Sequence, residues 1–286
     1  MPLAVKNIAY TYQAKTPYQT RAINNISIKV SPGEIMGVTG HSGSGKSTLL
    51  LILAGMLKPD QGAVELEDDS CRLLTPDQGR VWHQRVGLVQ QFPERQIFER
   101  LVYDEIAYGP RNMDMNRQQV MERVLWSMQQ VGLDYHSMKD RQTCSLSGGE
   151  QRRVAIASIL AMKPSYLLLD EPAAGLDYWG QEQLFKVLCQ LAAQSTGIIM
   201  VSHNMNHLSI CDRLLIIDRG TMVLEAACAD LPAYQPQLLP LGLKLAAYQD
   251  LITRLLHCGW PLSRRVQNRE QAAELIIQKL RQGAGH

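Results

Sequence analysis

Short hydrophobic runs separated by glycine-containing turns mark the first part of the chain. Residues 26–30 alternate apolar and polar side chains before the turn Ser31-Pro32-Gly33, and residues 35–39 form a short apolar run. Residues 46–56 have the spacing of a helix, with apolar side chains at Leu49, Leu50, Ile52 and Leu53. A strand that ends in glycines and is followed by a helix is typical of parallel α/β architecture, so we expect a core of that class.

The middle of the chain has the pattern of helices instead. Asn116 predicts the start of a helix that runs to Val131, with Gly132 as its stop. One face of this helix carries the apolar residues Val120, Val124, Leu125 and Met128. We therefore expect a helical subdomain at about residues 92–160, inserted between two α/β halves. Residues 166–169, 198–201 and 214–218 are short apolar runs typical of buried parallel strands.

The last part of the chain begins with three prolines that interrupt the pattern, Pro232, Pro236 and Pro240, and indicate a linker. Beyond them an amphipathic helix is predicted from the apolar positions Leu245, Tyr248, Ile252 and Leu255. Asn268 precedes a second predicted helix that runs through Leu280, with Gln271 placed for a capping box. We expect one domain over residues 1–230 and a small α-rich appendage over residues 231–286.

The composition of the 286 residues is that of an ordinary globular protein, with 45% hydrophobic and 20% charged residues. A net charge of +2 without a basic arm argues against nucleic acid as a partner. No apolar stretch approaches the roughly 20 residues of a membrane helix, and the start of the chain lacks a signal-peptide pattern. We expect a soluble protein whose six cysteines are buried free thiols, because they show no CxxC spacing: Cys71, Cys144, Cys189, Cys211, Cys228 and Cys258.

A phosphate-binding loop is predicted between the strand over residues 35–39 and the helix that follows. Gly40-His41-Ser42-Gly43-Ser44-Gly45-Lys46-Ser47 fits G-x-x-x-x-G-K-[ST], and Thr48 comes directly after it. Glycines let the chain curl so that several backbone N–H groups point at phosphate oxygens, and the helix N-terminus adds partial positive charge. We expect this loop to bind ATP, Lys46 to reach the β- and γ-phosphates, and Ser47 to ligate Mg²⁺.

Two carboxylates follow the apolar run Leu167-Leu168-Leu169. Asp170 is placed to bind Mg²⁺ through a water, and Glu171 to polarise the attacking water. Strands often end in acids at a surface turn, but this pair follows a phosphate loop in the same chain.

A second anion-binding helix start is predicted at Ser147-Gly148-Gly149, just before a helix over residues 154–162. One nucleotide does not need two such termini from one subunit. Two subunits that face each other and complete each other's sites do need both. A flexible Ser-Gly turn is the alternative interpretation, but it does not explain why this element lies just upstream of the Asp170-Glu171 strand.

With these three elements in order, residues 3–225 resemble the ATP-binding cassette family. The resemblance implies that Tyr12 stacks on adenine, with Tyr10 as a competitor, and that Gln91 links Mg²⁺ and the water to the partner interface, with Gln90 as an ambiguous neighbour. It implies that Asp177 belongs to a loop, Gly175-Leu176-Asp177, that crosses to the other subunit, and that His203 contacts the γ-phosphate. Two positions depart from the family pattern: Tyr178-Trp179 stands where proline is usual, and Glu150 replaces a common glutamine.

A narrower resemblance is to the ATPase subunits of energy-coupling-factor importers, which include cobalt and nickel uptake systems. It rests on Gln91-Phe92-Pro93-Glu94-Arg95-Gln96-Ile97-Phe98-Glu99, on Asp104-Glu105-Ile106-Ala107-Tyr108-Gly109-Pro110, on residues 12–18 and on residues 170–177. Glu94, Glu99, Asp104 and Glu105 are predicted to form an acidic cluster that receives basic residues of a membrane partner. A solvated acidic edge is the other interpretation.

Other machines that use similar loops fit the sequence less well. DNA-repair and chromosome-structuring cassettes need long coiled-coil arms, and residues 47–146 show no sustained heptads. A translation-associated protein would usually carry two cassettes, an exporter cassette is commonly fused to its membrane domain, and a kinase leaves Ser147-Gly148-Gly149 without a role.

The resemblance as a whole implies a P-loop NTPase core of the RecA-like kind, with an antiparallel β portion near the N-terminus. It implies ATP and Mg²⁺ as cofactors and a second ATPase subunit, identical or paralogous, as one partner. Integral membrane transport subunits are the other partners, with the chain at the cytoplasmic face of the cell membrane. A vitamin and a metal ion are both open as the transported substrate.

Overall fold

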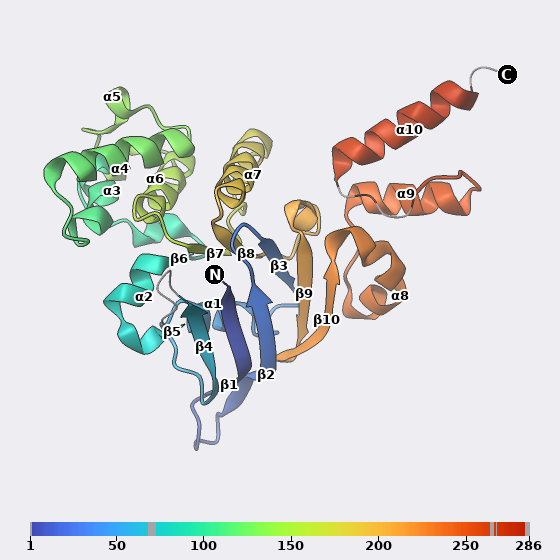
Figure 1. The fold of residues 1–286 in the computed structure, drawn as a ribbon, viewed down its shortest axis with the longest axis horizontal. Helices are drawn as coiled ribbons and strands as arrows, with labels where there is room; N and C mark the ends of the chain where they lie inside the picture. Colours follow the sequence, from blue (N-terminus) through green and yellow to red (C-terminus); the bar gives the residue numbers. More distant parts are fainter. Residues whose placement is uncertain (1, 68–72, 264–265, 267, 284–286) are drawn as a thin grey trace.

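The computed structural model describes residues 2–67, 73–263, 266 and 268–283. Two β-sheets lie side by side in the lower half of the molecule, with helices above them (Figure 1). The smaller sheet is antiparallel, has the order β2-β1-β4-β5 and consists of β1 (Leu3–Tyr12), β2 (Thr20–Val30), β4 (Gln61–Glu67) and β5 (Leu73–Leu74). This sheet confirms the expected antiparallel portion near the N-terminus.

The larger sheet has the order β10-β9-β3-β8-β7-β6 and holds the predicted parallel strands. Its strands are β3 (Ile35–Thr39), β6 (Val86–Val89), β7 (Tyr166–Asp170), β8 (Gly197–Val201), β9 (Arg213–Asp218) and β10 (Thr221–Ala227). All neighbours pair in parallel except β9 and β10. Because parallel strands end at one edge, the residues after β3, β6, β7 and β8 are brought together there.

The helices of the core and of the middle of the chain include the three that the sequence predicts, over residues 46–56, 116–131 and 154–162. They are α1 (Lys46–Leu53), α2 (Arg80–Arg85), α3 (Val102–Arg111), α4 (Arg117–Gln130), α5 (Tyr135–Met138), α6 (Gly148–Leu160) and α7 (Tyr178–Ala193). Helices α3 to α6 gather on one side of the molecule, at the upper left of Figure 1. The predicted start of α4 is confirmed, because the Asn116 side chain accepts the Gln119 N–H at 3.0 Å.

Two helix boundaries differ from the prediction for local reasons. Helix α1 ends at Leu53 and not at residue 56, because Gly55 takes a φ of 75° that helices do not continue through. Helix α6 begins at Gly148 and not at residue 154, because Ser147 and Glu150 form a capping box. The spacing S-x-x-E was the sequence signal for this earlier start.

The proline-rich segment is not an extended linker. It forms consecutive helical turns: the 3-10 helix η5 (Cys228–Tyr234), α8 (Gln235–Leu238) and η6 (Leu239–Leu241). Pro236 and Pro240 lie in the first turns of α8 and η6, where proline is tolerated, whereas Pro232 lies inside η5. Leu231 and Leu238 are buried in the main core. Beyond it α9 (Ala247–His257) and α10 (Arg269–Gly283) enclose a small separate cluster of Ala246, Tyr248, Ile252, Val266 and Ala272.

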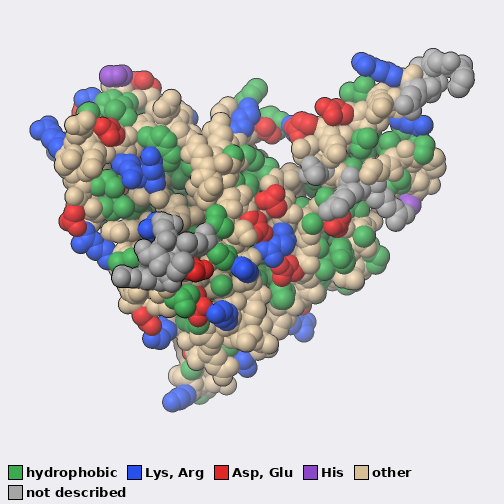
Figure 2. All heavy atoms as spheres, in the orientation of Figure 1, with side chains coloured by type: hydrophobic (Ala, Val, Ile, Leu, Met, Phe, Trp, Pro, Cys, Tyr) green, Lys and Arg blue, Asp and Glu red, His purple; other side chains and the backbone are tan. Residues whose placement is uncertain are grey.

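Two further expectations concern the surface. Cys211 and Cys228 are buried free thiols as predicted, but Cys144, Cys189 and Cys258 are exposed, and Cys71 lies outside the described residues. Among the described residues, no helix combines the length and apolar character needed to cross a membrane. Acidic and basic side chains are interspersed on the face seen in Figure 2.

Candidate functional site

The phosphate loop between β3 and α1 has a backbone that only glycine accommodates at two positions. A Cβ atom on Gly40 would lie 2.0 Å from the Ile217 carbonyl oxygen, and one on Gly45 would lie 2.3 Å from the Ala22 carbonyl oxygen. Both residues also have positive φ angles, of 146° and 106°. The predicted loop therefore forms where the sequence placed it, at the N-terminus of α1.

Lys46 already points back across this loop. Its ammonium group donates hydrogen bonds to the carbonyl oxygens of Gly40 and His41, both at 2.8 Å. Burial lowers the pKa of Lys46, while the nearby carboxylates of Glu171 and Asp170 oppose that shift. A partly desolvated ammonium group that is hydrogen-bonded to neutral oxygen atoms is suited to bind phosphate oxygens, because their negative charge would neutralise it.

Asp170 lies beside the start of α1, as predicted for a magnesium ligand. Burial raises the pKa of Asp170, and a hydrogen bond from the Ser47 hydroxyl opposes this shift. Two hard oxygen donors, one from β7 and one from α1, thus meet next to the phosphate loop. This donor chemistry fits Mg²⁺, which uses one or two protein oxygens together with phosphate oxygens and water.

Glu171 and His203 meet directly, although 32 positions separate them in the sequence. A Glu171 carboxylate oxygen accepts hydrogen bonds from the His203 backbone N–H at 2.8 Å and from the His203 Nδ1 position at 2.7 Å. The Ser202 hydroxyl donates to the other carboxylate oxygen at 3.1 Å. The Glu171 side chain is 12% exposed and that of His203 is 77% exposed, so a half-buried carboxylate lies beneath an accessible imidazole.

Glu171 also has a backbone conformation that is rare for its residue type. Its φ of 48° lies in the left-handed region, and its N–H donates to the Val201 carbonyl oxygen at 3.0 Å. Such positions cluster at functional sites, where the surrounding structure maintains them. The carboxylate is therefore aimed by the backbone of β7 and β8.

Sequence reasoning missed a further histidine in this network. The Nδ1 of His207 lies 3.4 Å from the Ser202 hydroxyl oxygen, and its Nε2 lies 3.2 Å from the Asn204 amide nitrogen. Burial lowers the pKa of His207, although Glu171 opposes this shift. His207 thus positions Ser202, which in turn contacts Glu171. The available sequence signal was its spacing from His203, four residues along the same loop.

The two candidate adenine residues occupy different environments. Tyr12 is exposed at the end of β1, and its hydroxyl lies 3.3 Å from the Thr48 hydroxyl in α1. Tyr10 packs against the core of the smaller sheet and makes an edge contact with the Tyr12 ring at 4.9 Å. Tyr12 is the ring that lies beside the phosphate loop and open to solvent. This geometry favours Tyr12 for stacking on a base.

The two glutamines after β6 also point to different surroundings. Val89 pairs with Leu169, so the chain leaves β6 level with Asp170 and Glu171. The Gln90 amide contacts the Met56 sulfur at 3.8 Å, whereas Gln91 is exposed. Of the two, Gln91 is the one free to turn toward a nucleotide and its water.

Ser147 begins α6 with its side chain tied to Glu150. The Ser147 hydroxyl oxygen accepts the Glu150 N–H at 3.3 Å, and the Glu150 carboxylate accepts the Ser147 N–H at 2.8 Å. Arg141 holds the same carboxylate at 2.9 Å. Glu150, which stands where the family commonly has glutamine, thus takes part in the capping box at the start of α6. Among the described residues, no hydrogen bond or ion pair joins this helix start to the phosphate loop of the same chain.

The loop that ends at Asp177 lies against the helix that Ser147 begins. Asp177 caps α7 by accepting the Gly180 N–H at 2.8 Å. A Cβ atom on Gly175 would lie 3.7 Å from a guanidinium nitrogen of Arg152, one turn into α6. Arg152 is buried and faces Glu94 at 3.7 Å. This ion pair connects α6, the Asp177 loop and the segment after Gln91.

The predicted acidic cluster does not form one surface. Glu105 is buried and accepts the backbone N–H groups of Phe98 at 3.1 Å and Glu99 at 2.8 Å. Glu94 faces Arg152, and Asp104 accepts a hydrogen bond from Arg111 at 2.9 Å. Because each of these three carboxylates has a partner within the chain, they organise the segment and do not present a shared negative patch.

A groove of about 700 Å³ lies in this region instead, between α2, α3 and α6. Phe98 and Tyr108 line it, with their rings in edge contact at 4.7 Å and both exposed. Its charged rim is mixed, with Arg80, His83, Arg111 and Asp114. The groove is aromatic, with charges of both signs around it.

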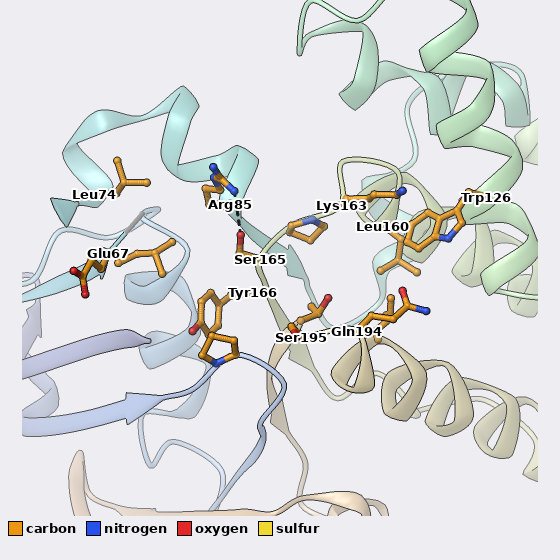
Figure 3. A pocket seen from close by; sticks show the side chains of 15 residues that line it. Glu67, Leu74, Arg85, Trp126, Leu160, Lys163, Ser165, Tyr166, Gln194 and Ser195 are labelled. Carbon is orange, nitrogen blue, oxygen red and sulfur yellow. Dashed lines mark hydrogen bonds between the residues drawn. The ribbon is translucent and has the colours of Figure 1, made fainter. Parts of the chain in front are cut away.

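A second cavity, of about 390 Å³, lies away from the phosphate loop. Figure 3 shows Tyr166 and Ser165 near one side of it and Trp126 with Lys163 near the other. Tyr166 opens β7, and the cavity-lining residue Thr196 directly precedes β8, so this cavity lies at the amino ends of the parallel strands. The predicted site residues that follow these strands, Asp170, Glu171 and His203, lie at the opposite, carboxyl ends.

Known proteins share both the sequence and the fold of this chain. Residues 23–174 match the family model described as "ABC transporter". The chain is 37% identical to the energy-coupling factor transporter ATP-binding protein EcfA2 of Clostridium perfringens, covering 98% of this chain and 99% of that protein. It is 36% identical to EcfA2 of Symbiobacterium thermophilum, with 96% of each chain covered.

Two solved structures extend the likeness to three dimensions. CbiO1 of Clostridium perfringens, part of the ABC transporter complex CbiONQ, superposes with a TM-score of 0.71 at 29% identity, covering 89% of this chain and 98% of that chain. The ATP-binding cassette MJ0796, in a dimeric post-hydrolysis state with ADP and phosphate, gives a TM-score of 0.69 at 25% identity over 79% of this chain and 98% of that chain. The chain therefore belongs to the ATP-binding cassette transporter family and, within it, to the ATP-binding proteins of energy-coupling factor transporters.

Proposed function

We propose that this chain binds and hydrolyses ATP as a peripheral subunit of an energy-coupling factor importer, at the cytoplasmic face of the membrane. The observation that carries this proposal is the convergence of Lys46, Asp170, Glu171 and His203 at the carboxyl edge of one parallel sheet. The phosphate loop would bind the nucleotide, and the half-buried carboxylate of Glu171 would act as the base.

Each residue has a definable task in hydrolysis. The backbone N–H groups of the loop, together with Lys46, hold the β- and γ-phosphates and stabilise the charge that develops on the transferred phosphoryl group. Glu171 accepts a proton from the attacking water, while the His203 ring, anchored on Glu171, contacts the γ-phosphate. Gln91 reports the presence of the γ-phosphate to the segment that follows it. Tyr12 stacks on the adenine ring.

The Ser47 hydroxyl and the Asp170 carboxylate would hold Mg²⁺, with Asp170 acting through a water. The ion would neutralise charge on the phosphate oxygens when bound. Gln91 is the remaining candidate ligand, and waters and phosphate oxygens would complete the shell of the ion, as is usual for Mg²⁺.

A second ATPase subunit completes each site. The N–H groups at the start of α6, around Ser147, Gly148 and Gly149, form an anion-binding terminus, and within the described part of the chain no hydrogen bond or ion pair joins it to the phosphate loop. Their use across a subunit interface explains why one chain carries two such termini. Asp177 lies in the adjoining loop and would enter the same interface. The dimeric state of the related cassette MJ0796 supports this arrangement.

The membrane partner would dock in the groove beside α2, α3 and α6. Phe98 and Tyr108 offer an apolar surface for a partner helix, and the mixed rim charges set its orientation. The groove adjoins the segment that follows Gln91, so a change at the γ-phosphate can be transmitted to it. Purification of the tagged chain from its native membranes should recover an integral membrane protein, and recovery of none would contradict this part of the proposal.

The substitution Glu171→Gln tests the proposed chemistry. It should leave ATP binding intact and reduce hydrolysis by about 10²–10⁴-fold, because the base is lost while the phosphate loop is unchanged. Glu122→Gln, at an exposed position on α4, is the matched control and should keep wild-type turnover. The assay is phosphate release without any acceptor molecule, which also separates an ATPase from a kinase. Near-normal hydrolysis by Glu171→Gln would remove Glu171 from the catalytic role.

A further inference from the structure

A two-residue turn joins β9 to β10 and lies beside the phosphate loop. Its central residues, Arg219 and Gly220, have φ angles of 46° and 76°, and Asp218 pairs with Thr221 across the turn. Positive φ at both central positions is the requirement of a type I′ turn, whose twist matches that of two antiparallel strands. The Thr221 hydroxyl also donates to the Asp218 carbonyl oxygen at 2.8 Å, so the hairpin itself fixes the shape of this turn.

The backbone of this turn is bonded to the phosphate loop. The Gly220 N–H donates to the Ser44 carbonyl oxygen at 2.9 Å. The Gly220 carbonyl oxygen accepts the N–H of Asn24, a residue of β2, at 2.7 Å. Strand β2 belongs to the smaller sheet, whereas β9 and β10 belong to the larger one. The turn therefore ties the phosphate loop to both sheets.

A side-chain contact joins the same turn to another point of the phosphate loop. The Nε2 atom of His41 lies 3.3 Å from a carboxylate oxygen of Asp218. The two side chains are 48% and 25% exposed, so solvent screens this pair only in part. The Ser44 N–H donates to the His41 carbonyl oxygen at 3.1 Å, which makes these two residues the ends of a tight turn within the loop. The β9–β10 turn thus holds both ends of residues 41–44.

Residues 41–44 are also the part of the loop that Lys46 contacts. The Lys46 ammonium group donates to the His41 carbonyl oxygen at 2.8 Å and lies 3.5 Å from the Ser44 hydroxyl oxygen. A shift of either residue would change the position of the ammonium group and the direction of the loop N–H groups. Groups that are already ordered lose less conformational freedom on binding, so anchoring this part of the loop favours nucleotide affinity.

We propose that Asp218 is a positioning residue for ATP binding, which acts through the His41 side chain and holds residues 41–44 in their binding conformation together with the Gly220 backbone. This role rests on the proposed function, because it needs the loop to bind ATP. A carboxylate beside the loop could instead act by repulsion, because its negative charge opposes that of the triphosphate. The two roles differ in sign: loss of a positioning group weakens ATP binding, whereas loss of a repelling charge strengthens it.

The experiment uses the full chain and measures the dissociation constant of the nonhydrolysable analogue AMP-PNP with Mg²⁺ by calorimetry. Asp218→Ala should raise this constant by about two- to fivefold, the range of a partly exposed ion pair. Asp77→Ala, which removes the acid of the exposed pair with Lys58 at 3.1 Å, is the matched control and should bind the analogue like wild type.

ATP hydrolysis separates positioning from a general loss of structure. Asp218→Ala should raise KM in the same proportion as the dissociation constant and leave kcat unchanged, because in the described part of the chain no hydrogen bond or ion pair joins Asp218 to Glu171 or His203. Loss of folded protein would instead lower the apparent kcat and the number of binding sites, with KM unchanged. That result would overturn the positioning role.

The route through His41 is tested in a second background. His41→Ala should weaken analogue binding at least as much as Asp218→Ala does, and adding Asp218→Ala to it should have no further effect. An equal further loss in that background would show that Asp218 does not act through His41. If wild type binds the analogue and Asp218→Ala binds it equally or more tightly, only the positioning role is wrong. If wild type binds no analogue, the proposed function is wrong and the positioning role falls with it.

Discussion

The ion pair between buried Arg152 and half-buried Glu94 gives the most specific prediction about how the parts of the site are connected. Burial lowers the pKa of Arg152, and Glu94 opposes that shift. The Nε atom of Arg152 and one Glu94 carboxylate oxygen are both buried without a hydrogen bond among the described residues. Each of the two charged groups is therefore stabilised chiefly by the other. Removing either partner should destabilise the segment after Gln91 together with α6.

The size of this effect follows from the 3.7 Å separation of the two charged groups. At an effective dielectric constant of about 20, two unit charges at this distance attract by about 4 kcal/mol. The desolvation of both groups offsets much of this attraction. We therefore expect a coupling free energy of about 1–3 kcal/mol, within the range seen for residues in one network.

A double-mutant cycle measures this quantity. The free energy of unfolding is determined by urea titration for wild type, Glu94→Gln, Arg152→Met and the double variant. Each single variant should be less stable than wild type, and the double variant should lose less than the two losses added together. Additive losses would mean that the pair does not interact. The pair also limits what the substitution Glu94→Lys can show. The new lysine would face Arg152 and disturb the chain itself, so a loss of transport by this variant would not be evidence for a contact with basic residues of a partner.

Two further predictions concern the nucleotide and the buried acid. Tyr12→Ala should weaken ATP binding several-fold, because stacking on a base contributes about 1–3 kcal/mol. A larger loss of nucleotide affinity for Tyr10→Ala would show that the other ring stacks. Burial raises the pKa of Glu105, so its contribution to stability is fully present below its ordinary pKa of 4.5 and is lost as the pH rises through the raised value. The free energy of unfolding of Glu105→Gln minus that of wild type, measured by urea titration, should therefore increase from acid to neutral pH. A difference that does not change with pH would contradict this.

Local signals in the sequence were sufficient for much of the core. The strand over residues 35–39, the phosphate loop and the start of α4 at Asn116 each have a signal within a few residues of sequence, and each was placed correctly. The carboxylate pattern assigned Glu171 to the site and the family resemblance assigned His203, and the structure shows why they meet: β7 and β8 are neighbouring parallel strands that end at one edge of the sheet.

Contacts between distant residues were the ones that the sequence did not reveal. Glu94 is paired with Arg152 and Glu105 is buried, and both read as surface acids because nothing nearby in the sequence shows their partners. The prolines of residues 232–240 indicated a linker, but this segment forms helical turns that are stabilised by the burial of Leu231 and Leu238 in the core. The sequence around the prolines does not show that burial. The earlier start of α6 is a different case, since the S-x-x-E spacing at Ser147 was visible in the sequence.

The shared site is the central claim, and mixing two inactive variants tests it most directly. Ser147→Arg blocks the helix start that one subunit offers to its partner, and Lys46→Ala disables the phosphate loop of its own subunit. Each variant alone should hydrolyse ATP far more slowly than wild type. In a mixed dimer one site carries both lesions and the other carries neither, so mixing should restore phosphate release that neither protein shows alone. If the mixture stays as inactive as its components, or if Ser147→Arg alone hydrolyses ATP like wild type, the two subunits do not build each other's sites.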